Sequence, residues 1–564
     1  MSNYVIALGG TGVRVLRSIV HLCDCGHIDV DELKVLIVDP DITNGSKDAV
    51  RQLITDYNAC RDDMQGVERS DFPLFKTKIT RAVEEDIALT PVASVDGVAH
   101  STKFHIKDLV SRGGRGSDAE INFMKALYSR KEYAELNISE GFFAHPSIGA
   151  LAFARWLEES TQINDMLDEM RHDIGSKGEE ANIFIIASSF GGTGASGFPA
   201  MATKIKKALH QYPNRFHIAG VFLLPYFSFM RKKGGDQVLD PKKFLESAKN
   251  AMMYYREYEV TTDFDKIYVL GAPEGDDDRK SLKMIRNKYA DKGAEQDNWP
   301  HILELYAALA AKECFSSSVG SMLAKKSSNH VRNWVGISLG KHSFYDIKWE
   351  DFPSGESLRL DISKLLLFNY IFIPAVLNEF VECTPHGIRK KSLSKDVVNW
   401  PSIKRAPFLA AKGKGKGWDE EAFGDNVGLK KFDRLLKYFD KQSTWLYRLL
   451  TAYEHDEGAI GTGDQLFAGL FGHQMLKSRY ITAREIEGNN GVDFSEVTSR
   501  FIKDHAGSIG AGGAFISGSN IAWSDVYSDI YNCVHKDMDK KQDLDYAVRQ
   551  MYHSIYKRIS ARIS

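Results

Sequence analysis

The sequence contains few cysteines, almost no net charge and no apolar run long enough to cross a membrane. Its six cysteines form no pair with zinc-binding spacing, since Cys23 and Cys25 enclose a single residue and no second pair lies elsewhere. With 73 lysines and arginines against 75 aspartates and glutamates, the net charge is −2. The composition therefore argues against a disulfide scaffold and against binding of nucleic acid or anionic membranes through overall charge.

Signals for a membrane or for secretion are weak as well. The apolar stretch 365–377 is too short to span a bilayer, and Lys364 and Glu379 bound it. The first residues lead into an apolar strand without the basic and apolar segments of a signal peptide. We therefore expect a cytoplasmic protein with reduced thiols. At 564 residues, 43% of them hydrophobic, the chain is long enough for two or three domains.

Apolar strands alternate with helical segments in the first half of the chain. The pattern predicts buried strands at 4–8, 33–39, 183–189, 216–225 and 266–273. Strands that are apolar on both faces and alternate with helices predict an α/β fold with a Rossmann-like, doubly wound parallel sheet. Ligands of such sheets bind beyond the carboxyl ends of the strands.

The remainder of the chain is predicted to be mostly helical. A buried helix is expected at 301–315, strands at 334–339 and 344–351, and an amphipathic helix at 430–450. We expect a nucleotide-binding domain over 1–298, a core helix and the start of a second domain over 299–355, and a divergent helical domain over 356–564. The basic tail at 546–562 is either a partner-binding segment or a solvated surface.

The tetrapeptide Gly-Gly-Thr-Gly occurs twice, each time between an apolar strand and a helix. It covers Gly9, Gly10, Thr11 and Gly12, and again Gly191, Gly192, Thr193 and Gly194. Glycines let the backbone approach an anion closely, and the unpaired N–H groups at a helix start favour phosphate. One such turn also fits an NAD(P) site, in which Asp39 binds the ribose, or a tight turn without a ligand.

The second glycine turn makes both the NAD(P) site and the turn without a ligand less favoured. A dinucleotide site gives no reason for a second glycine turn, and the sequence contains neither the Tyr-x-x-x-Lys pair of short-chain dehydrogenases nor a Walker motif. Two turns on neighbouring strands fit a nucleoside di- or triphosphate held across the top of the sheet. The sequence therefore favours such a nucleotide as the ligand.

The stretch IFIIASSFGGTGASGFPAMATKIKKAL, followed by FHIAGVFLLPYFSF, resembles the tubulin/FtsZ superfamily, whose glycine loop reads GGGTG[ST]G. YVIALGGTGVRVL is similar to the first FtsZ loop, VLIVDPD to the Val-Asp-Leu-Glu of tubulin, and RGGRGSDAEINF (112–123) to the loop that faces the terminal phosphate. The resemblance covers roughly residues 1–350 and is greatest to divergent bacterial tubulin-like proteins. Phe190 and Ser196 depart from the family loop, in which both positions are glycine.

The resemblance implies GTP or GDP as the ligand, with Mg²⁺. The first turn would contact the α and β phosphates, and the second turn with Ala195 would hold the rest of the phosphate chain. Further roles implied by it are the metal for Asp39 and Asp41, the γ-phosphate for Arg112, Gly114, Arg115 and Gly116, and the guanine edge for Glu304. A solvated loop at 112–116 and a surface position for Glu304 are the plainer alternatives.

The resemblance also implies head-to-tail assembly of identical subunits, with nucleotide between them. The family hydrolyses GTP through an Asn-x-Asp-x-x-Asp stretch, and the nearest match is DIKWEDF, with Asp346, Glu350 and Asp351 as candidate catalytic residues. Lys348 takes the place of the carboxylate that orients water, so catalysis is rearranged, slow or absent, or the segment is an ordinary edge strand. A switch that does not polymerise, acting on a protein partner through the C-terminal region, and an NAD(P) enzyme stay open.

Overall fold

The computed structural model describes the helical and sheet core of the chain in separate ranges. These are residues 1–40, 45–64, 72–83, 105–111, 117–138, 142, 145–226, 228–229, 241–257, 263–271, 286–287, 299–319, 334–338, 347–379, 381–384, 387–390, 427–451, 465–471, 473, 476–477, 514–516, 519–521, 556–557, 559–561 and 563. Contacts divide the chain into one unit of residues 1–20, 30–52 and 78–346, and a second of residues 21–29, 53–77 and 347–564.

The first unit is built on a parallel sheet that has seven strands within the described residues, in the order β3-β2-β1-β4-β5-β7-β9. The strands are β1 (Ser2–Leu8), β2 (Glu32–Val38), β3 (Lys78–Arg81), β4 (Ala181–Ser188), β5 (Phe216–Leu223), β7 (Lys266–Gly271) and β9 (Trp334–Ser338). Every residue of β1, β4 and β5 is buried, which explains their unbroken apolar sequences.

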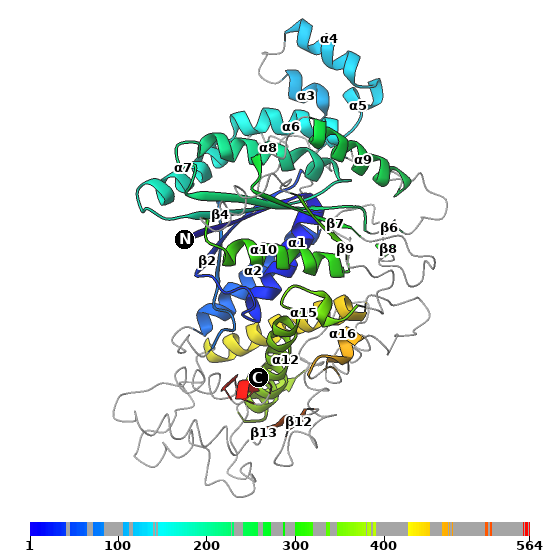
Figure 1. Ribbon diagram of the computed structural model, residues 1–564. Coiled ribbons are helices and arrows are strands. Elements are labelled where there is room, and N and C mark those ends of the chain that lie inside the picture. Colours follow the sequence, from blue (N-terminus) through cyan, green and yellow to red (C-terminus); the bar gives the residue numbers. More distant parts are fainter. Residues whose placement is uncertain are drawn as a thin grey trace, which may run out of the picture. The chain divides into compact units, whose positions relative to one another are not determined.

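Helices cover both faces of this sheet (Figure 1). The helices that begin in the first unit are α1 (Gly9–Asp24), α2 (Gly45–Asp63), α3 (Ile106–Ser111), α4 (Asp118–Leu127), α5 (Arg130–Ala134), α6 (Pro146–Glu159), α7 (Thr161–Gly175), α8 (Gly192–Ala208), α9 (Pro241–Glu257) and α10 (Ile302–Ser316). One core lies between the sheet and α6, α7 and α8, where Ile6 of β1 and Ile185 of β4 contribute. Phe184, which points to the other face, contacts Phe315 of α10 at 6.3 Å between ring centroids. The sheet is therefore doubly wound, as the sequence predicts.

The second unit is mainly helical in its described residues. It contains the ends of α1 and α2, the 3-10 helix η6 (Trp349–Asp351), α12 (Gly355–Glu379), α15 (Val427–Thr451) and α16 (Gln465–Ala468). The Tyr438 hydroxyl of α15 donates to Asp24 at 2.8 Å, and Arg434 donates two hydrogen bonds of 2.7 Å to the carboxylate of Asp63. These contacts hold α15 against the ends of α1 and α2 within this unit.

Short two-stranded ladders complete the described strands. They pair β6 (Ser228–Phe229) with β8 (Arg286–Asn287), β10 (Val381–Thr384) with β11 (Gly387–Lys390), and β12 (Ala514–Ile516) with β13 (Ser519–Ile521).

Two expectations about the middle of the chain were wrong. Strand β9 does not begin a second domain, because it pairs in parallel with β7 and extends the main sheet. The described part of the expected strand 344–351 is not a strand, since Trp349–Asp351 forms a 3-10 turn. The contacts group residues 347–564 with 21–29 and 53–77, and the predicted domain boundaries stay predictions.

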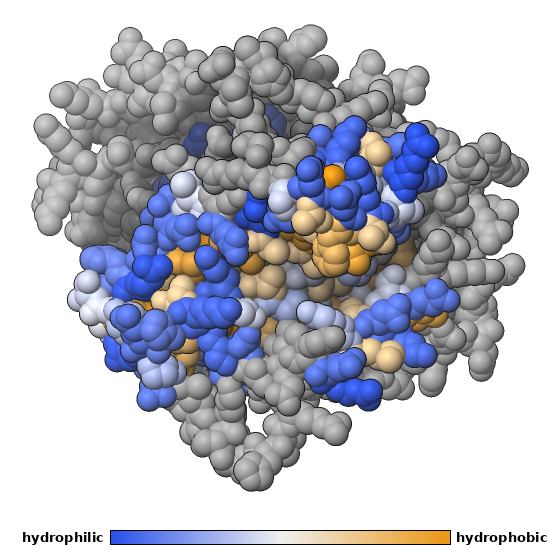
Figure 2. Space-filling model, turned by 90° about the horizontal axis from the view of Figure 1, so that it is seen from above, coloured by the Kyte–Doolittle hydropathy of each residue, from blue (hydrophilic) through white to orange (hydrophobic). Residues whose placement is uncertain are grey.

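In the coloured part of the surface in Figure 2, hydrophilic side chains surround separate apolar patches. Large exposed apolar side chains of the described residues include Phe123 and Leu127 on α4 and Leu245, Met253 and Tyr254 on α9. None of the described helices combines the length and the apolar character that crossing a membrane requires.

Candidate functional site

The two glycine turns lie side by side at one edge of the sheet. Strand β1 pairs with β4 in parallel, and the chain leaves both strands at their carboxyl ends through a Gly-Gly-Thr-Gly turn. The chain then runs from β1 toward β2 on one side and from β4 toward β5 on the other, so strand order reverses between β1 and β4. Open α/β sheets bind their ligands at this reversal point. Helices α1 and α8 therefore both begin at the expected ligand position.

The turns contact each other through Gly9 and Thr193. Gly9, the first residue of α1, has a left-handed backbone with φ of +67°. A Cβ atom added to Gly9 would lie 3.2 Å from the Cβ of Thr193, which is closer than ordinary van der Waals contact. Glycine is needed at position 9 for both reasons, the backbone angle and the space.

Gly12 and Gly194 instead allow each helix to pack closely on the strand before it. A Cβ atom on Gly12 would lie 2.8 Å from the carbonyl carbon of Ala7 in β1. A Cβ atom on Gly194 would lie 2.7 Å from the backbone nitrogen of Ser188 in β4. The two turns thus repeat one packing solution, and these two glycines are explained without a ligand.

The donors of the second turn fit a phosphate group. Gly191 caps α8 without a side-chain hydrogen bond, whereas Ser160 caps α7 by accepting from the amide of Ile163. Thr11 and Thr193 are 8% and 7% exposed, and their hydroxyls form no hydrogen bond with any other residue that the structure describes. Helix amides without a capping side chain, and hydroxyls without a protein partner, are the groups that an anion satisfies.

The residues that depart from the family loop have structural partners. Phe190 is buried and packs against Tyr226 and Phe244, with ring centroids 6.3 and 5.1 Å apart. The hydroxyl of Ser196 donates to the carbonyl of Gly192 at 2.6 Å, one turn earlier in α8. Both side chains are thus held by neighbouring protein groups.

Helix α8 begins at Gly192, seven residues before Pro199, which lies inside it. Proline has no N–H to donate to the carbonyl four residues earlier, that of Ala195. The hydroxyl of Tyr255 in α9 donates to this carbonyl instead. The carbonyl of Ala195 therefore serves the packing of α9 on α8, and its amide donates to the carbonyl of Gly191 at 3.0 Å.

The other predicted ligand contacts are described only in part. Asp39 follows β2 at the same edge of the sheet and is 4% exposed. Asp41, Arg112, Gly114, Arg115 and Gly116 lie outside the described residues. No group of three or more His, Cys, Asp or Glu side chains forms a metal site within the described part of the chain. The magnesium site remains a prediction.

Glu304 is not a surface residue. It is fully buried in α10, where twelve of the fifteen residues are buried. Its Oε1 accepts from Arg14 Nε at 2.5 Å and from the Tyr226 hydroxyl at 2.7 Å, and its Oε2 accepts from the His301 amide at 3.1 Å. We therefore interpret Glu304 as a structural acceptor and not as the group that recognises guanine.

Residues 347–352 of the candidate hydrolysis segment belong to the second unit. Asp346 lies outside the described residues, Glu350 is exposed, and Asp351 is half-buried. Oδ2 of Asp351 accepts from the backbone amide of Lys348 at 2.8 Å and so caps the 3-10 turn. Glu350, whose carboxylate is exposed, is the better candidate for orienting water, although its catalytic role stays a prediction.

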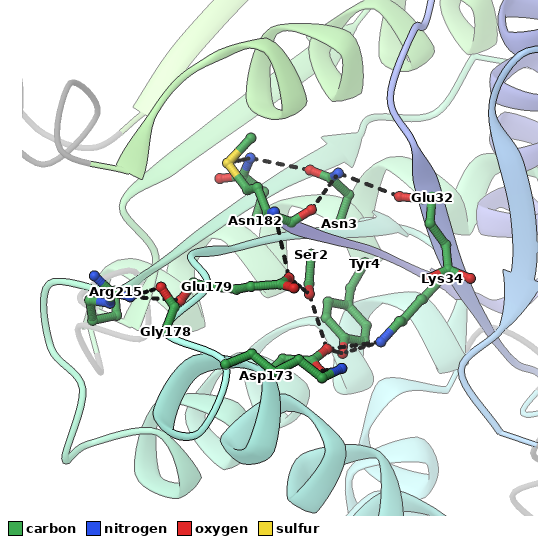
Figure 3. A network of polar contacts seen from close by, with 12 residues as sticks. Ser2, Asn3, Tyr4, Glu32, Lys34, Asp173, Gly178, Glu179, Asn182 and Arg215 are labelled. Carbon is green, nitrogen blue, oxygen red and sulfur yellow. Dashed lines mark hydrogen bonds and ion pairs between the residues drawn. The ribbon is translucent and has the colours of Figure 1, made fainter.

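A polar cluster at the opposite edge of the sheet was not anticipated from the sequence (Figure 3). Lys34 Nζ donates to Asp173 at 2.9 Å and to Glu169 at 2.6 Å, and the hydroxyls of Ser2 and Tyr4 donate to Asp173 at 3.0 and 3.3 Å. Burial would raise the pKa of Asp173, but hydrogen bonds from Lys177, Lys34 and Ser2 lower it below its ordinary value. The cluster lies at the amino ends of the strands, away from the glycine turns.

Comparisons with known proteins give distant likenesses among solved structures alone. No family profile and no curated protein matches the chain. Among solved structures, CetZ from Methanosaeta thermophila strain DSM 6194, a tubulin-like protein, matches with 13% sequence identity and a TM-score of 0.27. The match covers 59% of this chain and 61% of that chain, so this chain spans less than two thirds of it. The fold assignment therefore rests on the strand order and the helix layers described above.

Proposed function

We propose that this protein binds GTP or GDP with Mg²⁺ at the two glycine turns and that nucleotide-bound copies assemble head-to-tail into filaments. The observation that carries the proposal is the contact between Gly9 and Thr193, which joins the two turns at the reversal point of the sheet. Two helix starts directed at one place provide two sets of amides for one phosphate chain.

The choice of a nucleoside di- or triphosphate over NAD(P) depends on the second turn. The strand order is common to both classes of site, so topology does not separate them. A dinucleotide needs one glycine turn beside its pyrophosphate, whereas a nucleoside triphosphate has three phosphates to satisfy. Guanine itself, and assembly with nucleotide between subunits, come from the sequence resemblance to the tubulin/FtsZ superfamily.

The identity of the ligand is tested by releasing it from the purified protein. Heating the protein and separating the supernatant by ion-exchange chromatography with mass spectrometry should yield GDP or GTP. Recovery of NAD(P) would contradict the proposal. If the protein is purified empty, titration with labelled GDP, ADP and NAD⁺ provides the same comparison.

Assembly is tested separately from binding. Light scattering and sedimentation with GTP, GDP and a non-hydrolysable GTP analogue should give pelleted protein with GTP and with the analogue. Binding of GTP without any assembly would favour the alternative of a switch that acts on a protein partner through the helical second unit. The substitution of the family's catalytic carboxylate by Lys348 is the observation in favour of that alternative.

A further inference from the structure

A buried ion pair connects the two glycine turns on the side of the sheet that α1 and α10 cover. Arg14 lies in α1, two residues beyond the first turn, and its Nε donates to Glu304 of α10 at 2.5 Å. Arg14 and Glu304 are 4% and 0% exposed. A second guanidinium nitrogen of Arg14 donates to the carbonyl of Trp299 at 2.8 Å. Burial alone lowers the pKa of Arg14, but Glu304 raises it above its ordinary value.

Tyr226 extends this pair to the second turn. Its hydroxyl donates to the same oxygen of Glu304 at 2.7 Å, and its ring meets the ring of Phe190 edge-on at 6.3 Å between centroids. Phe190 lies directly before Gly191 in the second turn. Burial, together with the neighbouring Glu304 carboxylate, raises the pKa of Tyr226 well above its ordinary value, so the phenol remains a donor.

The contacts form one continuous chain from turn to turn. It runs from the helix of the first turn through Arg14, Glu304 and Tyr226 to Phe190 in the second turn. A buried carboxylate with three donors has little freedom to move, because each lost hydrogen bond leaves a charged group poorly satisfied. The family loop has glycine at position 190, which cannot make the ring contact.

We propose that Glu304 and Tyr226 are positioning residues that fix the distance between the two glycine turns, and that Phe190 is the contact through which the second turn is held. The inference rests on the proposed function, because fixed spacing matters for a ligand that binds both turns at once. It accounts for the substitution of glycine by phenylalanine in the second turn, and it gives Glu304 a role at the site without contact to the base.

The test substitution is Tyr226→Phe, which removes one hydroxyl and keeps the ring. A matched control is Tyr4→Phe, since Tyr4 is also fully buried and also donates to the carboxylate of an ion pair, but at the opposite end of the strands. In the ligand-free protein, hydrogen exchange measured by mass spectrometry should become faster in both turns, 9–12 and 189–195, in Tyr226→Phe. In Tyr4→Phe the exchange of these turns should not change.

Nucleotide binding supplies the second measurement. Tyr226→Phe should weaken binding of a non-hydrolysable GTP analogue by about 3- to 30-fold and GMP binding much less, because only the triphosphate chain bridges both turns. Loss of fold stability alone would weaken both ligands equally. Unchanged exchange in the turns, or an equal loss for the GTP analogue and GMP, would overturn the inference. Failure of the wild-type protein to bind GDP, with faster exchange still seen in Tyr226→Phe, would instead overturn the proposed function.

Discussion

Gly9 and Thr193, which are 184 positions apart in the sequence, face each other across the carboxyl ends of β1 and β4. A Cβ added to Gly9 would lie 3.2 Å from the Cβ of Thr193, so even an alanine there would require Thr193 to move. The repeated tetrapeptide is therefore not a structural duplication with two separate purposes. Its two copies complete one surface, in which each turn limits the shape of the other.

Replacing Gly9 by alanine should damage both stability and nucleotide binding. The left-handed backbone costs an alanine about 1–2 kcal/mol, and the contact with Thr193 adds to that. Gly178 offers a matched control, because its φ is +68° but an added Cβ would meet only Arg215 at 3.7 Å. Gly178→Ala should lose stability through the backbone alone and should bind GDP normally.

The measurements are urea unfolding midpoints and GDP titrations for both variants. Gly9→Ala should bind GDP at least tenfold more weakly than Gly178→Ala, which corresponds to about 1.4 kcal/mol. Equal GDP affinities in the two variants would mean that the first turn does not contact the nucleotide.

The hydroxyl of Thr193 should contribute to phosphate binding directly. Thr193→Val keeps the branched shape that touches Gly9 and removes the hydroxyl, so binding should weaken by about 1.5–3 kcal/mol, the value of a hydrogen bond to a charged group. Thr203→Val on the same helix is the control, since the Thr203 hydroxyl donates to Asp263 and not toward the turns. Calorimetry with a non-hydrolysable GTP analogue that gave the same affinity for both variants would remove Thr193 from the site.

The sheet could be predicted from the sequence because its strands are apolar without interruption. The described strands β1, β2, β4, β5 and β7 lie within two or three residues of the predicted ranges. The neighbouring placement of the two glycine turns was predicted as well, because a doubly wound sheet brings the carboxyl ends of its strands to one edge. Whether phosphate binds there remains a prediction.

Contacts between distant segments could not be predicted in the same way. Glu304 has its charged partner 290 positions away at Arg14, and nothing in the local sequence around either residue indicates the pair. The alternation in 344–351 is typical of a strand, but Trp349 is buried with its indole N–H donating to Leu466, and Asp351 caps a turn. In both cases the local structure depends on side-chain partners from distant parts of the sequence.

Glu350 should affect turnover of GTP and not its binding. An exposed carboxylate that orients water for the nucleotide of a second subunit would be lost in Glu350→Gln, and the turnover number should fall about 100-fold with unchanged GDP affinity. Glu356→Gln is the control, since Glu356 is an exposed carboxylate nearby in the sequence that pairs with Arg359. Phosphate release that is equally fast in the two variants would rule out Glu350 as the water-orienting group.

Asp173 should make the free energy of unfolding depend on pH, and it should not affect the nucleotide site. Its pKa is lowered in the folded protein, so near the ordinary value of about 4 the unfolded chain binds a proton that the folded chain does not. The stabilisation is therefore complete above about pH 5 and is lost as pH falls toward the folded pKa. Asp173→Asn should lower the unfolding free energy by about 3 kcal/mol at pH 7 and by progressively less below pH 4.

The control for this prediction is Asp168→Asn on the same helix, because Asp168 is 62% exposed and its ion pair with Arg171 is solvated. Exposed pairs contribute about 0–1 kcal/mol, so urea midpoints of this variant should follow the wild type at every pH. GDP affinity at pH 7 should be unchanged in both variants, since Asp173 lies at the amino ends of the strands and the turns lie at the carboxyl ends. A difference between Asp173→Asn and wild type that stayed constant from pH 7 to pH 3 would show that the carboxylate is not stabilised by its charge.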